Sequence, residues 1–286
     1  MSARAAPLAD AVVLPPVWRA VAAALRILAR GTLLYMAAAI VLAETPPNPL
    51  KQMRLFAALF LAPELAAWSI LRAFRAHVLI GQGLLVFEQR WRRIEIPLDA
   101  IAGVRPWILP VPSTGFTVTL RSGARFADGI AASDPVALIE AATGAGAADG
   151  LRDVLSQRTM FYARARLASW RSRLDQPFLK FVVFALVPAV PAFRLHQIIA
   201  YGGALGEYYT FGLKAYLIAF GIWWGSWIIG LVLSAAVLRA VIEIVTVLLA
   251  GVRFAYTGGV RRLLEVIALA IYYIGIPGWL FLRMLE

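Results

Sequence analysis

The sequence contains no cysteine and only two histidines, His77 and His196. Disulfides, iron–sulfur clusters and thiolate metal sites are therefore excluded, and a histidine-rich metal or haem site is not expected. The chain also lacks a nucleophile elbow, a phosphate-binding loop, an HExxH motif and an aspartate-rich metal cluster. We therefore expect no cofactor and a protein that is not an enzyme.

Charged residues are scarce, at 15 % of the 286 residues, whereas hydrophobic residues reach 61 %. Soluble domains average about 25 % and about 45–50 %, so the composition indicates an integral membrane protein. The net charge is +12 and rests on 25 arginines, three lysines and 16 acidic residues. In a membrane protein such an excess usually lies on the cytoplasmic side, and we expect no nucleic-acid partner.

Long apolar stretches predict five membrane spans, because a spanning helix needs about 20 mostly apolar residues. The predicted spans are 17–43, 55–71, 178–201, 213–238 and 263–282. The stretch 240–252 is short and flanked by arginines, so we interpret it as an interfacial helix; a six-span chain is the alternative. The positive-inside rule places the N-terminus and residues 77–176 in the cytoplasm.

Residues 77–176 are the only segment long and polar enough to form an extramembrane domain. Short strands are predicted at 78–80, 84–87, 91–96 and in a hairpin at 116–126. Asp134 followed by Pro135 is a typical helix start. The predicted organisation is a two-helix membrane hairpin (1–76), a small α+β domain (77–147), a basic interfacial helix (148–176) and C-terminal membrane helices (177–286).

The small domain resembles the bacterial pleckstrin-homology-like (PH-like) domain over about residues 77–145. The resemblance is carried by GLLVF at 83–87, RIEIPLDAIAGV at 93–104, the hairpin and the helix from Asp134. It implies a polytopic α-helical membrane protein with a PH-like cytoplasmic domain inserted between spans 2 and 3. Such a domain binds a protein, a peptide or a lipid headgroup and does not catalyse a reaction. The segment is shorter than a seven-stranded domain, so we expect one sheet edge to lack a strand or to be covered.

Arginines crowd the predicted basic helix, which also has an aromatic face. They are Arg152, Arg158, Arg164, Arg166, Arg171 and Arg173. A basic helix beside a span is typical of contact with anionic phospholipid; arginines that only orient the third span are the alternative. Arg90 and Arg92, on one face of a predicted strand, are a second candidate for lipid or partner binding, against a solvated strand face.

Four ionisable residues within apolar stretches are unusual: Glu64, Arg194, Glu243 and Glu265. Glu265 lies close to Arg261 and Arg262, so we expect it at the membrane interface. Such residues are costly in lipid and usually face a protein interior or a cavity. Glu243 lies four residues after Arg239, which is the spacing of a helical ion pair. A transporter or lipid-handling protein with a site near Glu64 and Arg194 is therefore the alternative function, and structural pairing between helices is the simpler interpretation.

Small residues recur at four-residue spacing in the fourth predicted span, beside three tryptophans. They are Gly221, Gly225, Ser226 and Gly230, with Trp223, Trp224 and Trp227. Small residues at this spacing let helices approach closely, either within the chain or against another membrane protein subunit. The mid-span tryptophans suggest packing against another protein or a hydrophobic ligand, with ordinary packing in the helix bundle as the alternative. Together these patterns predict an accessory, assembly or scaffold subunit of a membrane complex, which docks a partner or anionic lipid through its cytoplasmic domain.

Overall fold

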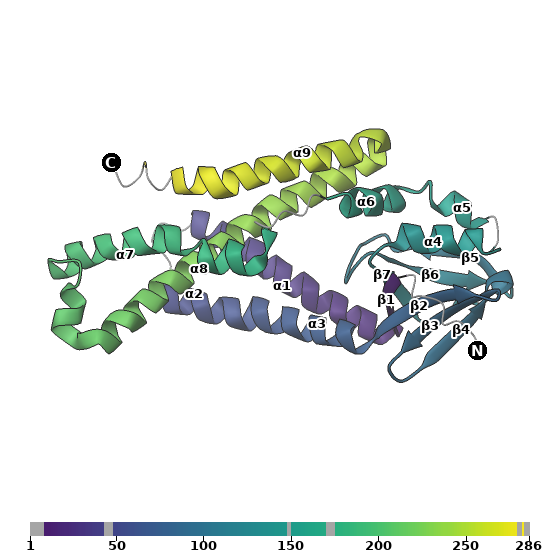
Figure 1. The fold of residues 1–286 in the computed structure, drawn as a ribbon, viewed down its shortest axis with the longest axis horizontal. Helices are drawn as coiled ribbons and strands as arrows, with labels where there is room; N and C mark the ends of the chain where they lie inside the picture. The colour runs from purple at the N-terminus through teal and green to yellow at the C-terminus, as the bar shows by residue number, and fades with distance from the viewer. Residues whose placement is uncertain (1–8, 43–47, 148–149, 170–174, 279–281, 283–286) are drawn as a thin grey trace. The chain divides into compact units, whose positions relative to one another are not determined.

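The computed structural model describes the chain except residues 1–8, 43–47, 148–149, 170–174, 279–281 and 283–286 (Figure 1). The chain forms two compact units. The first comprises residues 1–28, 62–169 and 244–261, and the second comprises residues 29–61, 170–243 and 262–286.

The first unit is built on a seven-stranded antiparallel sheet with the strand order β4-β3-β2-β1-β7-β6-β5 (Figure 1). The strands are β1 (Ala9–Leu14), β2 (Arg75–Gly81), β3 (Leu84–Gln89), β4 (Arg93–Pro97), β5 (Ile101–Pro106), β6 (Gly115–Leu120) and β7 (Gly129–Ala132). β1 pairs with β2 on one side and with β7 on the other, so a strand from the start of the chain holds the centre of the sheet.

The predicted fold class is wrong, because the sheet is not confined to an insertion between spans 2 and 3. Its central strand, β1, precedes the first long helix, while the other six strands follow residue 74. The sequence analysis missed β1 because its apolar residues run on into the apolar helix from Pro16, and six residues give a weak strand signal. The sheet expected to lack a strand is completed by residues 9–14.

Helix α4 packs against the sheet. α4 (Pro135–Gly144) begins as the sequence predicts: Asp134 Oδ1 accepts a hydrogen bond from the Ala137 N–H at 2.8 Å, and Pro135 occupies the first helical position. Leu138 and Ile139 of α4 are buried in one hydrophobic core with Phe87 of the sheet. The short helices α5 (Gly150–Val154) and α6 (Arg158–Leu167) add to this core.

Four helices among the described residues are long and apolar enough to cross a membrane, which is compatible with membrane association. The first is α1 (Pro16–Leu42), and the second combines α2 (Pro49–Phe56), the π-helical η1 (Ala57–Leu61) and α3 (Ala62–Ala73). The third combines the π-helical η4 (Phe178–Val183) with α7 (Leu186–Tyr201), and the fourth is α8 (Gly206–Val252).

The prediction of five or six spans is also wrong. Residues 240–252 are not a separate interfacial helix but continue α8. The predicted last span, 263–282, overlaps α9 (Thr257–Ala270) and contains the π-helical η6 (Ile271–Gly275), and this helical segment is not one of the four. α9 carries Arg261, Arg262 and Glu265, which lower the hydropathy of this helical segment.

Helix packing dominates the second unit. Leu33 and Met36 of α1 are buried against Ile229 and Leu233 of α8. A separate cluster joins Tyr272 to residues of α8 and to the end of η4. Near its start α8 is interrupted at Gly212, where φ of +83° is a backbone conformation that favours glycine.

Candidate functional site

A cavity of about 1080 Å³ lies within the first unit, between the β5–β6 hairpin, α6 and the last turns of α8. Its basic lining residues are Arg105, Arg125 and Arg158. Trp107 and Ile108, at the end of β5, give one apolar wall, and Val247 and Ala250 of α8 give another. The cavity therefore combines cationic groups with the apolar end of a helix that is long enough to span a membrane.

The charge of this cavity is of one sign. No aspartate or glutamate is among its lining residues. Within the described ranges, none of its three arginines forms an ion pair. Guanidinium groups match phosphate and carboxylate oxygens in geometry and charge, so this lining favours an anion.

Three separate segments bring the arginines together. Arg105 lies near the end of β5, and Arg125 pairs with Thr119 in an isolated bridge that extends the β6 hairpin. Arg158 is the first residue of α6. Its Cδ lies 3.5 Å from the point where a Cβ of residue 251 would stand, so Gly251 lets the arginine stem pack closely against α8.

A hydroxyl group next to Arg158 adds a polar atom to the cavity lining. The Oγ1 atom of Thr159 is buried and has no hydrogen-bond partner in the described part of the chain. A buried polar atom without a partner is costly, and rotation about χ1 would let this hydroxyl donate to a bound anion.

The structure places the predicted basic residues in several environments. Arg158 lines the cavity, whereas Arg164 donates to Glu140 Oε1 at 2.8 Å and Arg166 is half-buried on α6. The side chain of Arg152, on α5, is not described. Arg171 and Arg173 lie outside the described residues. Arg105 and Arg125 were missed, because only the fold brings them to Arg158.

The sequence analysis placed the second basic pair, Arg90 and Arg92, on a strand, and the structure does not. Arg90 and Arg92 belong to the turn between β3 and β4. The Arg90 guanidinium lies 4.6 Å from the centre of the Trp91 ring, and Arg92 donates to Asp128 Oδ2 at 3.3 Å. Neither arginine lines the cavity.

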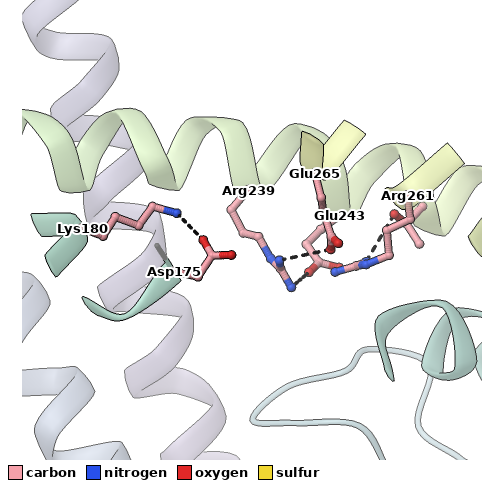
Figure 2. Close-up of polar contacts among 7 residues, drawn as sticks. Asp175, Lys180, Arg239, Glu243, Arg261 and Glu265 are labelled. Carbon is pink, nitrogen blue, oxygen red and sulfur yellow. Dashed lines mark hydrogen bonds and ion pairs between the residues drawn. The ribbon is translucent and has the colours of Figure 1, made fainter. Parts of the chain in front are cut away.

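An ionic cluster in the second unit contains the predicted pair on α8 (Figure 2). Arg239 Nη2 lies 2.8 Å from Glu243 Oε1, one helical turn away, so the predicted i,i+4 pair is confirmed. The same guanidinium lies 3.7 Å from Glu265 Oε1 of α9. Lys180 Nζ lies 3.0 Å from Asp175 Oδ1, and this pair is also drawn in Figure 2. The sequence analysis placed Glu265 near Arg261 and Arg262 and did not predict its contact with Arg239, because that contact joins two helices.

The two residues of the predicted transport site belong to different units. Glu64 is in the first unit, where its Oε1 lies 3.4 Å from Arg26 Nε. Arg26 also donates to the carbonyl oxygen of Pro112. Arg194 is exposed on α7 in the second unit. Neither unit by itself therefore contains the site expected near Glu64 and Arg194.

The small residues of α8 differ in what they face. A Cβ on Gly225 would stand 2.9 Å from Met53 Cε, whereas a Cβ on Gly221 or Gly230 would have no described atom within 4 Å. Ser226 donates to the carbonyl oxygen of Ile222 in its own helix. Gly225 thus supports close packing inside the chain, and Gly221 does not.

The three tryptophans of α8 pack within the second unit. Trp223 lies 5.1 Å from the His196 ring, and Trp224 Nε1 donates to the carbonyl oxygen of Val182 at 3.0 Å. Trp227 contacts the cluster around Tyr272. Each of them therefore has an intramolecular environment.

The described residues contain no group of three or more His, Asp and Glu side chains that could hold a metal ion. Comparison of the chain with protein-family models, with curated proteins and with solved structures gave no match. The resemblance to PH-like domains therefore stays a prediction. The feature that points to a function is the cavity lined by Arg105, Arg125 and Arg158, called the arginine cavity below.

Proposed function

We propose that this chain is a non-enzymatic accessory or scaffold protein of a bacterial inner membrane, which holds the headgroup of an anionic phospholipid in the arginine cavity. One observation carries the proposal: Arg105, Arg125 and Arg158 line a cavity without a carboxylate, beside the end of a candidate span. A phosphate group would be bound by the guanidinium groups, while an acyl chain would leave along Val247 and Ala250.

The pairing of β1 with β2 supports a membrane hairpin that begins and ends at the sheet, and the arginine excess supports a cytoplasmic position for that sheet. β1 precedes α1, and β2 follows α3, yet the two strands are neighbours in one sheet. The helices at 16–42 and 49–73 therefore leave the sheet and return to it, as a membrane hairpin would. The excess of arginine in residues 77–176 supports placing this side, with the N-terminus, in the cytoplasm.

Thermal stability of the detergent-purified full chain tests the lipid site. We expect dioctanoyl-phosphatidylglycerol to raise the melting temperature, because a ligand that binds the native state stabilises it. Dioctanoyl-phosphatidylcholine should have a much smaller effect. Inorganic phosphate is the third arm: if it stabilises as well as phosphatidylglycerol, the ligand is a free phosphate compound and the lipid assignment is wrong.

The matching variant replaces the three cavity arginines by glutamine (R105Q/R125Q/R158Q). It should lose the response to phosphatidylglycerol. A control with the same loss of charge, R75Q/R90Q/R121Q, changes exposed arginines that do not line the cavity and should keep the response. An equal response of both variants would mean that attraction to lipid is diffuse, and it would overturn the cavity as the site.

A role as a complex subunit is the second part of the proposal. The surface of α8 at Gly221 is open within the described chain, and it fits another membrane helix. Native mass of the protein purified in mild detergent tests this part. A monomer free of other proteins, from cells that express it at its natural level, would contradict it.

A further inference from the structure

Two adjacent apolar side chains project from the loop between β5 and β6. Ile108 is 90 % exposed and Leu109 is 68 % exposed. Among the described residues from 75 to 169, the only other exposed large hydrophobic residues are Trp91 and Leu167. Contiguous exposed apolar surface is one mark of contact with lipid or another molecule.

The loop is fastened along the first helix at two points. The guanidinium group of Arg19 lies 4.9 Å from the centre of the Trp107 ring, a cation–π contact. Arg26 donates to the carbonyl oxygen of Pro112. Seven residues of an α-helix rise about 10 Å, so the loop runs along roughly two turns of α1.

The height of the loop on α1 coincides with the expected membrane boundary. α1 is a candidate span that ends at Leu42. A bilayer core takes about 20 residues of helix, so the spanning part of α1 would begin near residue 23. That level lies between Arg19 and Arg26, the two residues that hold the loop.

The backbone of the loop suits a place with little water. Residues 110 and 112 are prolines and have no N–H to satisfy. The N–H of Trp107 donates to Gly115 at 2.9 Å, and that of Val111 donates to Leu109 at 2.8 Å. Most donors between 107 and 112 are therefore absent or already bonded, which reduces the cost of removing the loop from water.

We propose that the β5–β6 loop, residues 107–112, inserts into the membrane interface beside the N-terminal half of α1. Ile108 and Leu109 lie among the upper acyl chains, and Trp107 lies at headgroup level, where tryptophan is enriched. Arg19 and Arg26 fix the depth of the loop by holding its two ends. The sheet is thus attached to the bilayer at a point separate from its connections to α1 and α3.

This inference requires that α1 lies in a membrane, but it does not require a lipid in the arginine cavity. Leu109 is not among the lining residues of the cavity. The loop therefore can be tested at Leu109 whatever the cavity binds, and R105Q/R125Q/R158Q should leave the depth of residue 109 unchanged.

The absence of cysteine makes a direct test possible, since one engineered cysteine gives one label. The full-length variant L109C, labelled with an environment-sensitive fluorophore, is placed in nanodiscs of phosphatidylcholine and phosphatidylglycerol. We expect blue-shifted emission, quenching by spin labels on the lipid chains and weak quenching by aqueous iodide. I108C provides a second position in the same loop.

The control position is Asp99, an exposed residue next to the β2–β3 turn, where the Leu98 N–H donates to the carbonyl oxygen of Gly83. β2 runs from α3 to this turn over seven residues, so Asp99 lies about 20 Å from the helix end of the sheet. D99C should show strong iodide quenching and no lipid quenching. If the labels at 108 and 109 are as accessible to iodide as the label at 99, the loop lies in water and the proposal is wrong.

Discussion

The side-chain amide of Gln89 donates a hydrogen bond to the carbonyl oxygen of Val13 at 2.9 Å, although 76 residues separate them in the chain. The same nitrogen lies 3.0 Å from the carbonyl oxygen of Phe74, and the Val13 N–H donates to that carbonyl as well. One side chain therefore joins the end of β1, the end of β3 and the residue that leads into β2. This is the point where the sheet connects to the helices on both sides.

We predict that Gln89→Leu destabilises the first unit by about 1–3 kcal/mol, because two carbonyl groups lose a donor that water does not fully replace. The melting temperature of the purified chain, followed by tryptophan fluorescence, should fall. Gln157→Leu is the control, since Gln157 is exposed and its side chain does not cap α6. Equal melting temperatures of Gln89→Leu and the native protein would show that the amide does not hold β1 in place.

The ionic cluster leads to a second prediction. Arg239 neutralises Glu243 and Glu265, and the Glu265 side chain is only 10 % exposed. Arg239→Gln leaves two carboxylates near each other without their shared cation, so we expect a loss of about 1–3 kcal/mol or more. Thermal unfolding in detergent measures it.

Arg262→Gln is the matched control for this cluster. Arg262 is exposed on α9 and forms no ion pair with any residue that the structure describes. It should melt within a degree or two of the native chain. In the triple variant Arg239→Gln/Glu243→Gln/Glu265→Gln, much of the lost stability should return, because the two negative charges that Arg239 offsets are removed with it. A triple variant less stable than Arg239→Gln would count against the electrostatic explanation.

The two glycines of the GxxxG pattern should respond differently to the same substitution. Gly225→Leu forces a side chain into the space of Met53, and overpacking of this kind costs about 1–3 kcal/mol. Gly221→Leu meets open space within the chain, and it should leave the melting temperature unchanged or slightly raised, since leucine favours helix more than glycine does.

Melting temperatures of the two single variants test this difference, and Met53→Ala should rescue Gly225→Leu by restoring room. If Gly221→Leu lowers the native mass of the purified assembly while its stability is kept, the open face is where another helix binds. If Gly225→Leu is as stable as the native chain, the contact with Met53 does not limit the packing of α2 on α8.

Local patterns predicted local features well. Asp134 and Pro135 mark the start of α4, and the apolar stretch from Phe178 to Tyr201 has the same bounds in the structure as in the sequence analysis. The pair Arg239 and Glu243 follows from helical spacing alone. Each of these features depends on residues within one or two helical turns of each other, where periodicity carries the information.

Features that depend on long-range pairing were missed. β1 is placed by strands that begin 60 or more residues later, and nothing in ADAVVL distinguishes a central strand from the start of an apolar helix. Arg105, Arg125 and Arg158 come from a strand, a hairpin and a helix. The only sequence signal for their meeting was the general excess of arginine, which has no positional information.

The position of β1 gives the last prediction. A fragment of residues 75–169 contains six of the seven strands and the helices α4, α5 and α6, but its sheet would have a gap between β2 and β7. Alternate residues of β1, Ala11 and Val13, are buried in the core, so the gap would expose that core to water. We expect this fragment to be unfolded or aggregated, with poorly dispersed amide resonances.

The matched variant joins residues 9–14 to residues 75–169 through a short glycine-rich loop in place of the helices between them. Val12 and Arg75 are paired across β1 and β2, so a loop of a few residues can close this hairpin without moving either strand. We expect the joined fragment to be a monomer with dispersed resonances and cooperative thermal unfolding. A version in which Val13 is replaced by aspartate should fail to fold, because the charge would lie in the core. If residues 75–169 fold equally well without β1, the strand is an accessory to the sheet and not its centre.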